Sequence, residues 1–327
     1  MKKLVSLILC LALLLVCAAA SAEISERTIR FSTTSAENTE IVKVMKNFGE
    51  LVKEASGGKI TVEVYPGSQL GGVPETYQNV QLGIQEMAVT SAATLASGGA
   101  TDFNAVTLPY VFKDVTHFIN VVNSDIGKNM LASTVPAGTR TVGIGFWSEG
   151  TRNFFTKEPV RTLEDMKGLK IRCQSLDVDT MMTEALGASP TPIAFSELYS
   201  ALQTGVVDGA ENPLSGIYNG KFQEVCKYVT LDAHSAPPVV IIFSEVIWNT
   251  MSDEEKNIIT ESWNTASAHN LEYLLENQAH YISLLQAEGV EVIELNDQDA
   301  WSAAMAPVYE KFGADVTDIL EAIAAMK

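Results

Sequence analysis

The sequence predicts an α/β protein of two lobes, with two mixed or parallel sheets, flanking helices and one long helix that spans both lobes. Residues 75–88 (ETYQNVQLGIQEMA) and 197–210 (ELYSALQTGVVDGA) share Glu, Tyr, Gln, Gly and Ala in register, 122 positions apart. Each copy is typical of a helix closed by glycine before a short apolar strand. Chains longer than about 250 residues tend to split into domains. Two such lobes would face each other across a cleft, where small ligands bind. The alternative is chance similarity of two helix–glycine–strand units.

The first lobe is expected to alternate strands and helices, which indicates a parallel sheet with helices on its faces. Its predicted strands are 28–33, 59–65 and 87–90. The glycine pair at 57–58 ends a helix that runs to about Ala55, and the repeat helix lies between the second and third strands.

The second half of the chain repeats this alternation. A strand at 139–147 is expected to cross between the lobes. Further strands are expected at 170–174 and 239–243, and a helix from about Asp177 to Leu186. Asn212-Pro213 is expected to break the chain just after the strand of the second repeat.

The long helix is predicted to begin at the capping box Ser252-Asp-Glu-Glu255 and to run to about Ala287. About 36 residues would span roughly 54 Å, which is longer than one lobe, so we expect this helix to brace both. The resulting division is a signal peptide at 1–22, lobe I at 23–148 plus about 238–275, and lobe II at about 149–237 plus 276–327.

The first residues resemble an export signal. Basic residues 2–3 precede an apolar run at 4–20 and an Ala-x-Ala site at 20–22. We therefore expect cleavage after Ala22 and a soluble protein in the periplasm, or on the cell surface of a host without an outer membrane. An uncleaved anchor is the alternative. Lipidation at Cys17 is disfavoured because the preceding Val16 is large.

The charge balance disfavours several kinds of partner. The whole chain has a net charge of −18, and removing the signal removes two Lys and leaves 20 Lys and Arg against 40 Asp and Glu. That surplus disfavours nucleic acid and anionic membrane surfaces as partners. Of the cysteines that remain, Cys173 and Cys226 could form a disulfide after export. Strand alternation instead favours Cys173 as a small buried apolar residue.

Catalytic and metal-binding signatures are missing from the sequence. The four His residues form no metal-ligand spacing, and there is no G-x-S-x-G, phosphate loop or GxGxxG. The sequence therefore predicts no metal, no cofactor and no enzymatic activity.

Three polar residues at predicted strand ends are candidates for ligand binding instead. Arg172 ends a strand with apolar neighbours, where open α/β sheets bind ligands, and a ligand carboxylate would offset the cost of burying its charge. The alternative is a structural ion pair with Glu or Asp. Asn212 can donate to and accept from a carboxylate or hydroxyl, or serve as a turn residue. Arg152, taken alone, would more often be a surface residue.

Several motifs resemble a known family. They are GLKIRCQS (168–175), the run from ALGASP to LSGIY (185–218), KFQEVCKYVTLDAH (221–234), SGGKITVEVYPGSQLG (56–71), ETYQNVQLGIQEM (75–87) and LPYVFKD (108–114). In this order, over nearly the whole mature chain, they resemble the DctP-type solute-binding proteins of TRAP transporters. The resemblance implies a two-lobed periplasmic binding protein that closes on an organic acid.

The resemblance also implies roles for individual residues. The family's carboxylate-binding Arg, in G-L-K-I-R, falls on Arg172, its second Arg, in G-x-R, on Arg152, and the Asn of E-N-P on Asn212. Partners would be a small organic acid and the small and large membrane permease subunits, with no nucleic acid and with a monomeric receptor. Alternatives are a periplasmic enzyme acting on an organic acid and a ligand-sensing partner of a membrane receptor kinase.

One departure from the family pattern affects the expected ligand. Many relatives have Val-Pro after the key Arg, whereas this chain has Cys173-Gln174. Gln174 would add a ligand contact or reshape the wall of the site. The further candidates for the wall are Glu37, Asn38, Ser91, Phe146 and Trp147.

Overall fold

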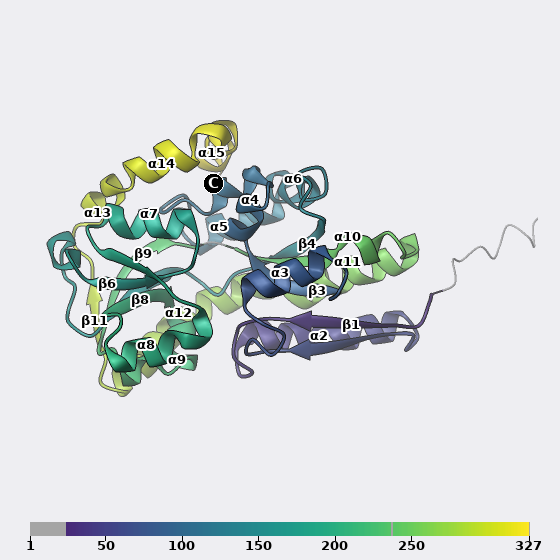
Figure 1. Ribbon diagram of the computed structural model, residues 1–327, viewed down its shortest axis with the longest axis horizontal. Coiled ribbons are helices and arrows are strands. Elements are labelled where there is room, and N and C mark those ends of the chain that lie inside the picture. The colour runs from purple at the N-terminus through teal and green to yellow at the C-terminus, as the bar shows by residue number, and fades with distance from the viewer. Residues whose placement is uncertain (1–23, 237, 327) are drawn as a thin grey trace, which may run out of the picture.

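The structure is a computed structural model that describes residues 24–236 and 238–326. Its strands form two separate sheets, one of five strands and one of six. Figure 1 shows the first sheet and its helices on the right and the second on the left. The predicted two-lobed α/β fold is confirmed. The signal peptide predicted at 1–22 lies outside the described residues.

The first sheet has the order β2-β1-β3-β10-β4. Its strands are β1 (Arg27–Ser32), β2 (Ile60–Tyr65), β3 (Met87–Ser91), β4 (Thr141–Trp147) and β10 (Val239–Ser244). β1 pairs in parallel with β2 and β3, whereas β10 runs antiparallel between β3 and β4. All five were expected from the sequence to within two residues.

The second sheet has the order β11-β9-β5-β8-β6-β7. Its strands are β5 (Arg152–Thr156), β6 (Lys170–Cys173), β7 (Ser189–Pro192), β8 (Gly209–Pro213), β9 (Tyr228–Ser235) and β11 (Glu291–Glu294). The chain break expected at Asn212-Pro213 is wrong. Both residues belong to β8, whose register pairs Asn212 with Asn153 and Pro213 with Arg152, and a helix begins only at Leu214.

Helices cover both faces of each sheet. Those beside the first sheet are α2 (Glu40–Ala55), α3 (Val73–Gln81), α4 (Ala92–Ser97), α5 (Val115–Asn123), α6 (Asp125–Ser133), α10 (Glu245–Trp248) and α11 (Asp253–Ser267). Those beside the second sheet are α7 (Asp177–Ala185), α8 (Leu198–Thr204) and α9 (Leu214–Asn219). The chain continues through α12 (Asn270–Ala287), α13 (Gln298–Ala304), α14 (Ala306–Phe312) and α15 (Thr317–Ala325).

Strand alternation divides the apolar residues into a core on each face. In β10, Ile241 and Phe243 join the cluster that holds Trp263 of α11, and Val240 and Ile242 join the cluster on the opposite face. Adjacent residues Phe154 and Phe155 of β5 divide the second sheet's core in the same way. Because both faces of both sheets are buried, little of either sheet faces water.

The prediction of one continuous long helix is also wrong, because the segment is broken into α11 and α12. The capping box at Ser252 and Glu255 is present as expected. At the break, the side chain of Asn270 turns to the backbone of Ser148, accepting from its N–H (2.9 Å) and donating to its carbonyl (2.8 Å). This contact with the chain segment between β4 and β5 explains the break. α12 still contacts both α5 and α9, and it runs between the two halves of the molecule in Figure 1.

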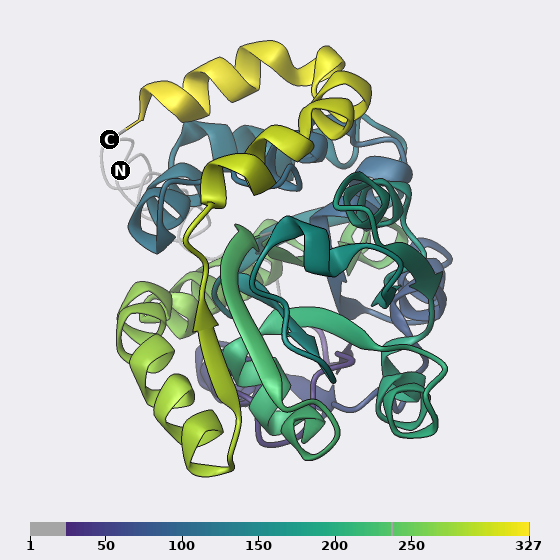
Figure 2. The same ribbon diagram turned by 90° about the vertical axis from the view of Figure 1, so that its left-hand side faces the viewer.

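The C-terminal segment passes from one lobe to the other. α14 packs on α7, whereas α15 packs on α6 and on the 3-10 helix at Thr101–Val106, beside the first sheet. The division expected from the sequence assigned residues 276–327 to lobe II. Figure 2 shows these last helices, in yellow, as a band along one side of the molecule.

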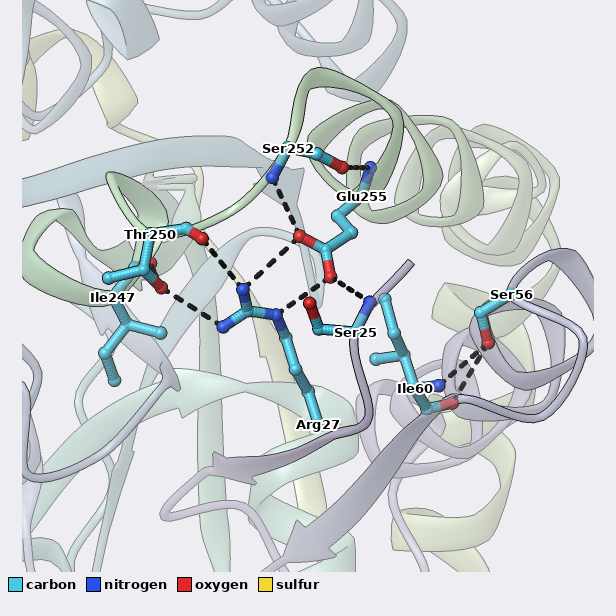
Figure 3. A network of polar contacts seen from close by, with 8 residues as sticks. All are labelled: Ser25, Arg27, Ser56, Ile60, Ile247, Thr250, Ser252 and Glu255. Carbon is cyan, nitrogen blue, oxygen red and sulfur yellow. Dashed lines mark hydrogen bonds and ion pairs between the residues drawn. The ribbon is translucent and has the colours of Figure 1, made fainter. Parts of the chain in front are cut away.

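A network around Glu255 ties the first strand to α11 (Figure 3). One carboxylate oxygen accepts from the Ser25 backbone N–H (2.8 Å) and from Arg27 Nε (3.0 Å). The other accepts from the Ser252 N–H (2.8 Å), which completes the helix cap. Arg27 also donates to the Thr250 carbonyl (2.8 Å). A single carboxylate therefore caps α11 and fixes the beginning of β1.

Three further observations concern the cysteines, possible metal sites and possible membrane spans of the described residues. Cys173 and Cys226 are both free and buried. Among the described residues, no cluster of three or more His, Cys, Asp and Glu side chains is arranged to hold a metal ion. None of the helices in the described part of the chain has the length and apolar character to span a membrane.

Candidate functional site: a carboxylate-binding cavity

A cavity of about 420 Å³ lies between residues of the two sheets. One wall comes from the segments that follow β1 and β2 and from the end of β3. The other comes from β6, β8 and α9, together with residues 193–196. These are carboxyl ends of parallel strands, where open α/β sheets bind ligands. The volume lies within the range of small-molecule sites, roughly 300–1,000 Å³.

Arg172 lies in this cavity without a carboxylate partner. Its residue is only 3 % exposed, at the end of β6. Nε donates to the Ile193 carbonyl (2.9 Å), and the guanidinium carbon lies 5.8 Å from the centre of the Phe195 ring. The two terminal nitrogens make no hydrogen bond to any described residue. Burial lowers the pKa of Arg172, because the charged form loses its hydration.

Arg152 lines the same cavity but is already paired. Nη2 donates to Glu211 Oε1 (2.8 Å) and to the Glu211 backbone carbonyl (3.0 Å), and Nε bonds the other carboxylate oxygen. Burial is the largest single effect and would raise the pKa of the Glu211 carboxyl, but the charges and hydrogen bonds of Arg152 and His234 together outweigh it and lower that pKa to about 2. The pair is therefore ionised and already neutralised before any ligand binds.

Behind this pair lie further buried titratable groups. His234 Nδ1 is 2.7 Å from Asp232 Oδ2, and its Nε2 is 3.5 Å from Glu211 Oε2. Burial opposes the charged imidazole, but the two carboxylates outweigh burial and raise its pKa to about 9. Asp179 has an Oδ2 that is buried without a partner, and burial followed by the nearby Glu211 charge raises its pKa to about 6.

Asn212 and Gln174 complete the second-lobe wall near the two arginines. Asn212 is 7 % exposed and lies in β8, and Gln174 directly follows β6. Neither side-chain amide bonds to another described residue, so both can donate and accept toward a ligand. Gly216 allows the close approach of Asn212, since a Cβ there would lie 2.9 Å from its Oδ1.

The first-lobe wall is rich in hydroxyl groups. It includes Thr34, Ser35, Ser68 and Thr90, as well as the expected Ser91, whose Oγ is 2.8 Å from Thr94 Oγ1 and caps α4. This wall also carries Glu75, from the first turn of α3. The local sequence places these residues here because each lies at the end of a strand, follows a strand or begins a helix at the same edge of the sheet.

Four of the residues expected at the wall lie outside the cavity lining. Glu37 points to Lys46 on the exposed side of α2, and Asn38 donates to Asn219 of the second lobe (3.1 Å). Phe146 packs beside Phe103 in the first-lobe core. Trp147 is fully buried against His269 and Tyr273. The structure brings together Arg172, Arg152, Asn212, Gln174 and Ser91, and not these four.

Sequence reasoning missed the groups that act behind the wall. These buried groups are Glu211, His234, Asp232 and Asp179. Sequence reasoning also missed four residues that line the cavity, which are Thr90, Glu75, Glu149 and Phe195. Glu211 directly precedes Asn212 in the E-N-P motif, and that adjacency was the available signal. His234 and Asp232 lie two positions apart on β9 and contact each other. Their contacts with Glu211 and with the Phe154 N–H gave no local signal, because these groups come from other strands.

Comparisons with known proteins show which proteins the chain resembles. Residues 31–315 match the family model DctP, described as bacterial extracellular solute-binding protein, family 7. The C4-dicarboxylate-binding periplasmic protein DctP of Rhodobacter capsulatus is 33% identical over 305 residues, covering 91% of this chain and 90% of the relative. The sialic acid-binding periplasmic protein SiaP of Vibrio cholerae is 31% identical, covering 97% of this chain and 98% of the relative.

Solved structures give the same result. A TRAP periplasmic solute-binding protein from Pseudomonas putida with bound D-glucuronate has a TM-score of 0.88 and 30% identity, covering 92% of this chain and 98% of that one. Another, from Sulfurospirillum deleyianum with bound succinate, has a TM-score of 0.85 and 29% identity, covering 93% and 100%. These relatives bind acids of different chemistry on one fold.

Proposed function

Because the chain belongs to the DctP family of bacterial extracellular solute-binding proteins, we propose that it is the substrate receptor of a TRAP-type secondary transporter. It binds a small organic acid between its lobes and delivers it to the small and large membrane permease subunits. The receptor acts as a monomer in the periplasm, or on the cell surface of a host without an outer membrane. It does not bind nucleic acid.

The observation that best supports this function is that the buried Arg172 has no carboxylate partner among the described residues. A buried charge without a partner costs several kcal/mol, so an empty site is an unfavourable environment for the guanidinium. A ligand carboxylate offsets that cost through two parallel N–H···O bonds, which fit the planar group. The Nε bond to Ile193 fixes the side chain of this lining residue and leaves its terminal nitrogens available to a ligand.

The neighbouring residues would orient the ligand rather than neutralise it. Glu211 holds Arg152 in place from behind, so Arg152 strengthens the carboxylate site without supplying a free charge. Asn212 and Gln174 offer donors and acceptors beside it. Because the lining comes from both lobes, a bound acid favours the closed arrangement over the open one.

The test is acid binding by the mature, ligand-stripped protein and by Arg172→Ala. A thermal-shift panel of C4-dicarboxylates, sugar acids, 2-oxo acids and hydroxy acids identifies a ligand, since saturation at 100 times Kd stabilises the fold by about 2.7 kcal/mol. Calorimetry should then show that Arg172→Ala loses about 2–5 kcal/mol of binding. Arg161→Ala, which removes an exposed pair with Glu291, is the control and should bind as wild type.

Two results would overturn the assignment. Near-wild-type affinity in Arg172→Ala would show that this guanidinium does not hold the carboxylate. A change in ligand mass after hours with the protein would favour the alternative of a periplasmic enzyme. A receptor returns the acid unchanged.

A further inference from the structure

The two walls of the cavity differ in chemistry. The lining cations among the described residues, Arg152 and Arg172, both belong to the second lobe, and Arg152 is already bonded to Glu211. One uncommitted cation therefore remains, which matches one ligand carboxylate. A second carboxylate on the same ligand would extend toward the first lobe, whose lining contains no Lys or Arg among the described residues.

The first-lobe wall offers hydroxyl groups without partners. The side-chain oxygens of Thr34, Ser35 and Ser68 bond to no described residue. Thr90, at 2 % exposure, has an Oγ1 that is buried and has no hydrogen-bond partner. Buried polar atoms are almost always bonded, so an unbonded hydroxyl in a cavity wall indicates a group on the ligand that bonds it. A ligand hydroxyl can both donate and accept there.

Glu75 gives this wall a negative charge. It occupies the first turn of α3, where the positive end of the helix dipole favours a carboxylate. The two glycines before the helix leave room for it: a Cβ on Gly71 would lie 2.9 Å from Glu75 Cβ, and one on Gly72 would lie 3.0 Å from Oε2. Glu75 makes no ion pair with a described residue. It can accept bonds from ligand hydroxyls, and it repels a second carboxylate.

We propose that this receptor selects a polyhydroxylated monocarboxylic acid, such as a hexuronate or an aldonate, and that Glu75 excludes dicarboxylates. The inference rests on the function proposed above and narrows its ligand. The second lobe binds the single carboxylate through Arg172. The hydroxyls of the ligand bind Thr90 and Glu75 on the first lobe, so only an acid carrying hydroxyls bridges both walls fully.

The test compares matched acids by calorimetry on the mature, ligand-stripped protein. The hexuronates D-glucuronate and D-galacturonate and the aldonate D-gluconate each carry one carboxylate and several hydroxyls. D-glucarate has the carbon chain of D-glucuronate with a second carboxylate, succinate has two carboxylates and no hydroxyl, and hexanoate has one and no hydroxyl. The best sugar monocarboxylate should bind at least about tenfold tighter than D-glucarate, succinate and hexanoate. A diacid or hexanoate that binds as tightly overturns the proposal.

Two variants connect this preference to the first-lobe wall. Thr90→Val keeps the shape but removes the hydroxyl, and it should weaken sugar-acid binding by about tenfold, the effect of losing one buried hydrogen bond. Glu75→Gln keeps an acceptor but removes the charge, so it should reduce the preference for D-glucuronate over D-glucarate by about tenfold. Thr61→Val on β2, outside the cavity, is the control and should change neither quantity. An unchanged preference in Glu75→Gln would contradict the role of that residue.

The outcomes separate this inference from the function on which it rests. If acids bind in an Arg172-dependent way without preference for sugar monocarboxylates, only the ligand class proposed here fails. If no acid in the panel binds the wild-type protein, or Arg172→Ala binds normally, the proposed function itself fails.

Discussion

Arg152 and Glu211 form a buried ion pair across neighbouring strands β5 and β8, with Nη2 at 2.8 Å from Oε1 and at 3.0 Å from the Glu211 carbonyl oxygen. Arg172, on the other neighbour of β8, has no such partner. Two arginines in one cavity therefore differ in whether their charge is already paired. The charge of Arg152 is needed by the fold, whereas that of Arg172 is available to a ligand.

Removing Glu211 should destabilise the fold strongly. Glu211→Ala leaves the Arg152 charge buried and unpaired, which costs about 3–5 kcal/mol. Urea denaturation of the ligand-free protein measures this cost. Arg172→Ala breaks no ion pair and should cost much less. Glu291→Ala, which removes only the exposed partner of Arg161, should stay within about 1 kcal/mol. A cost for Glu211→Ala no larger than that for Glu291→Ala would contradict the buried pair.

His234 should make stability depend on pH above neutrality. Its folded pKa of about 9 lies above the ordinary value of 6.5, so its contribution is fully present below pH 6.5 and is lost as pH rises through 9. The difference between these two pKa values corresponds to about 3 kcal/mol in the free energy of unfolding. Denaturation between pH 6 and 10 should show this decline in the wild type. His234→Asn should be less stable at pH 6 and should show no such decline, and an identical decline would assign it to another group.

The Asn38–Asn219 hydrogen bond should slow ligand release. Asn38 Nδ2 donates to Asn219 Oδ1 (3.1 Å), and Asn219 Nδ2 also reaches the hydroxyl of Tyr281 in α12 (3.4 Å). The bond joins a loop of the first lobe to the end of α9, so it exists only while the lobes are together. Asn38→Ala should release the ligand roughly two- to tenfold faster, with little change in association, as measured by stopped flow.

A double-mutant cycle with Asn219→Ala tests the pairing itself, because the second substitution should add little once the bond is lost. Glu37→Gln is the control, since the adjacent Glu37 points to Lys46 and not to the second lobe. Additive effects of the two Asn substitutions would show that they do not act through their shared bond.

The network in Figure 3 should contribute more to stability than an ordinary helix cap. Glu255→Ala removes the cap at Ser252 and leaves Arg27 without its carboxylate. A cap alone contributes about 1 kcal/mol, and a charged hydrogen bond roughly 1.5–3. We expect a loss of about 2–4 kcal/mol in urea denaturation. Asp253→Asn, in the same helical turn but exposed, should cost less than about 0.5 kcal/mol, and an equal loss would contradict the role of the network.

Local pattern predicted the repeated units well. The two repeats form α3 followed by β3 and α8 followed by β8, and the glycines that close the helices, Gly83 and Gly205, have φ of 71° and 79°. Only glycine adopts such angles readily, so a helix end is visible in the sequence itself. The break at Ala268 was not visible, because it follows from the contact of Asn270 with Ser148, 122 positions away.

The site was predictable only in part, because some of its residues have a signal in the local sequence and others do not. Arg172 stood out because a charge at the end of an apolar strand is unusual at the level of sequence. Trp147 and Phe146 gave no comparable signal, because an aromatic residue on a strand can face a core or a pocket. Their neighbours in the folded chain, such as Tyr273 and Phe103, are what put them in the core.

The sequence by itself determined the α/β alternation, the two related units and the arginine at the end of β6, since periodicity, glycine caps and strand ends are local properties. Only the tertiary structure decided which arginine is paired and which hydroxyls face the cavity. Arg152 meets Glu211 across 59 positions, and Thr90 shares a cavity with Arg172 through the packing of two lobes. Such neighbours are set by the assembled sheets, which no single stretch of sequence encodes.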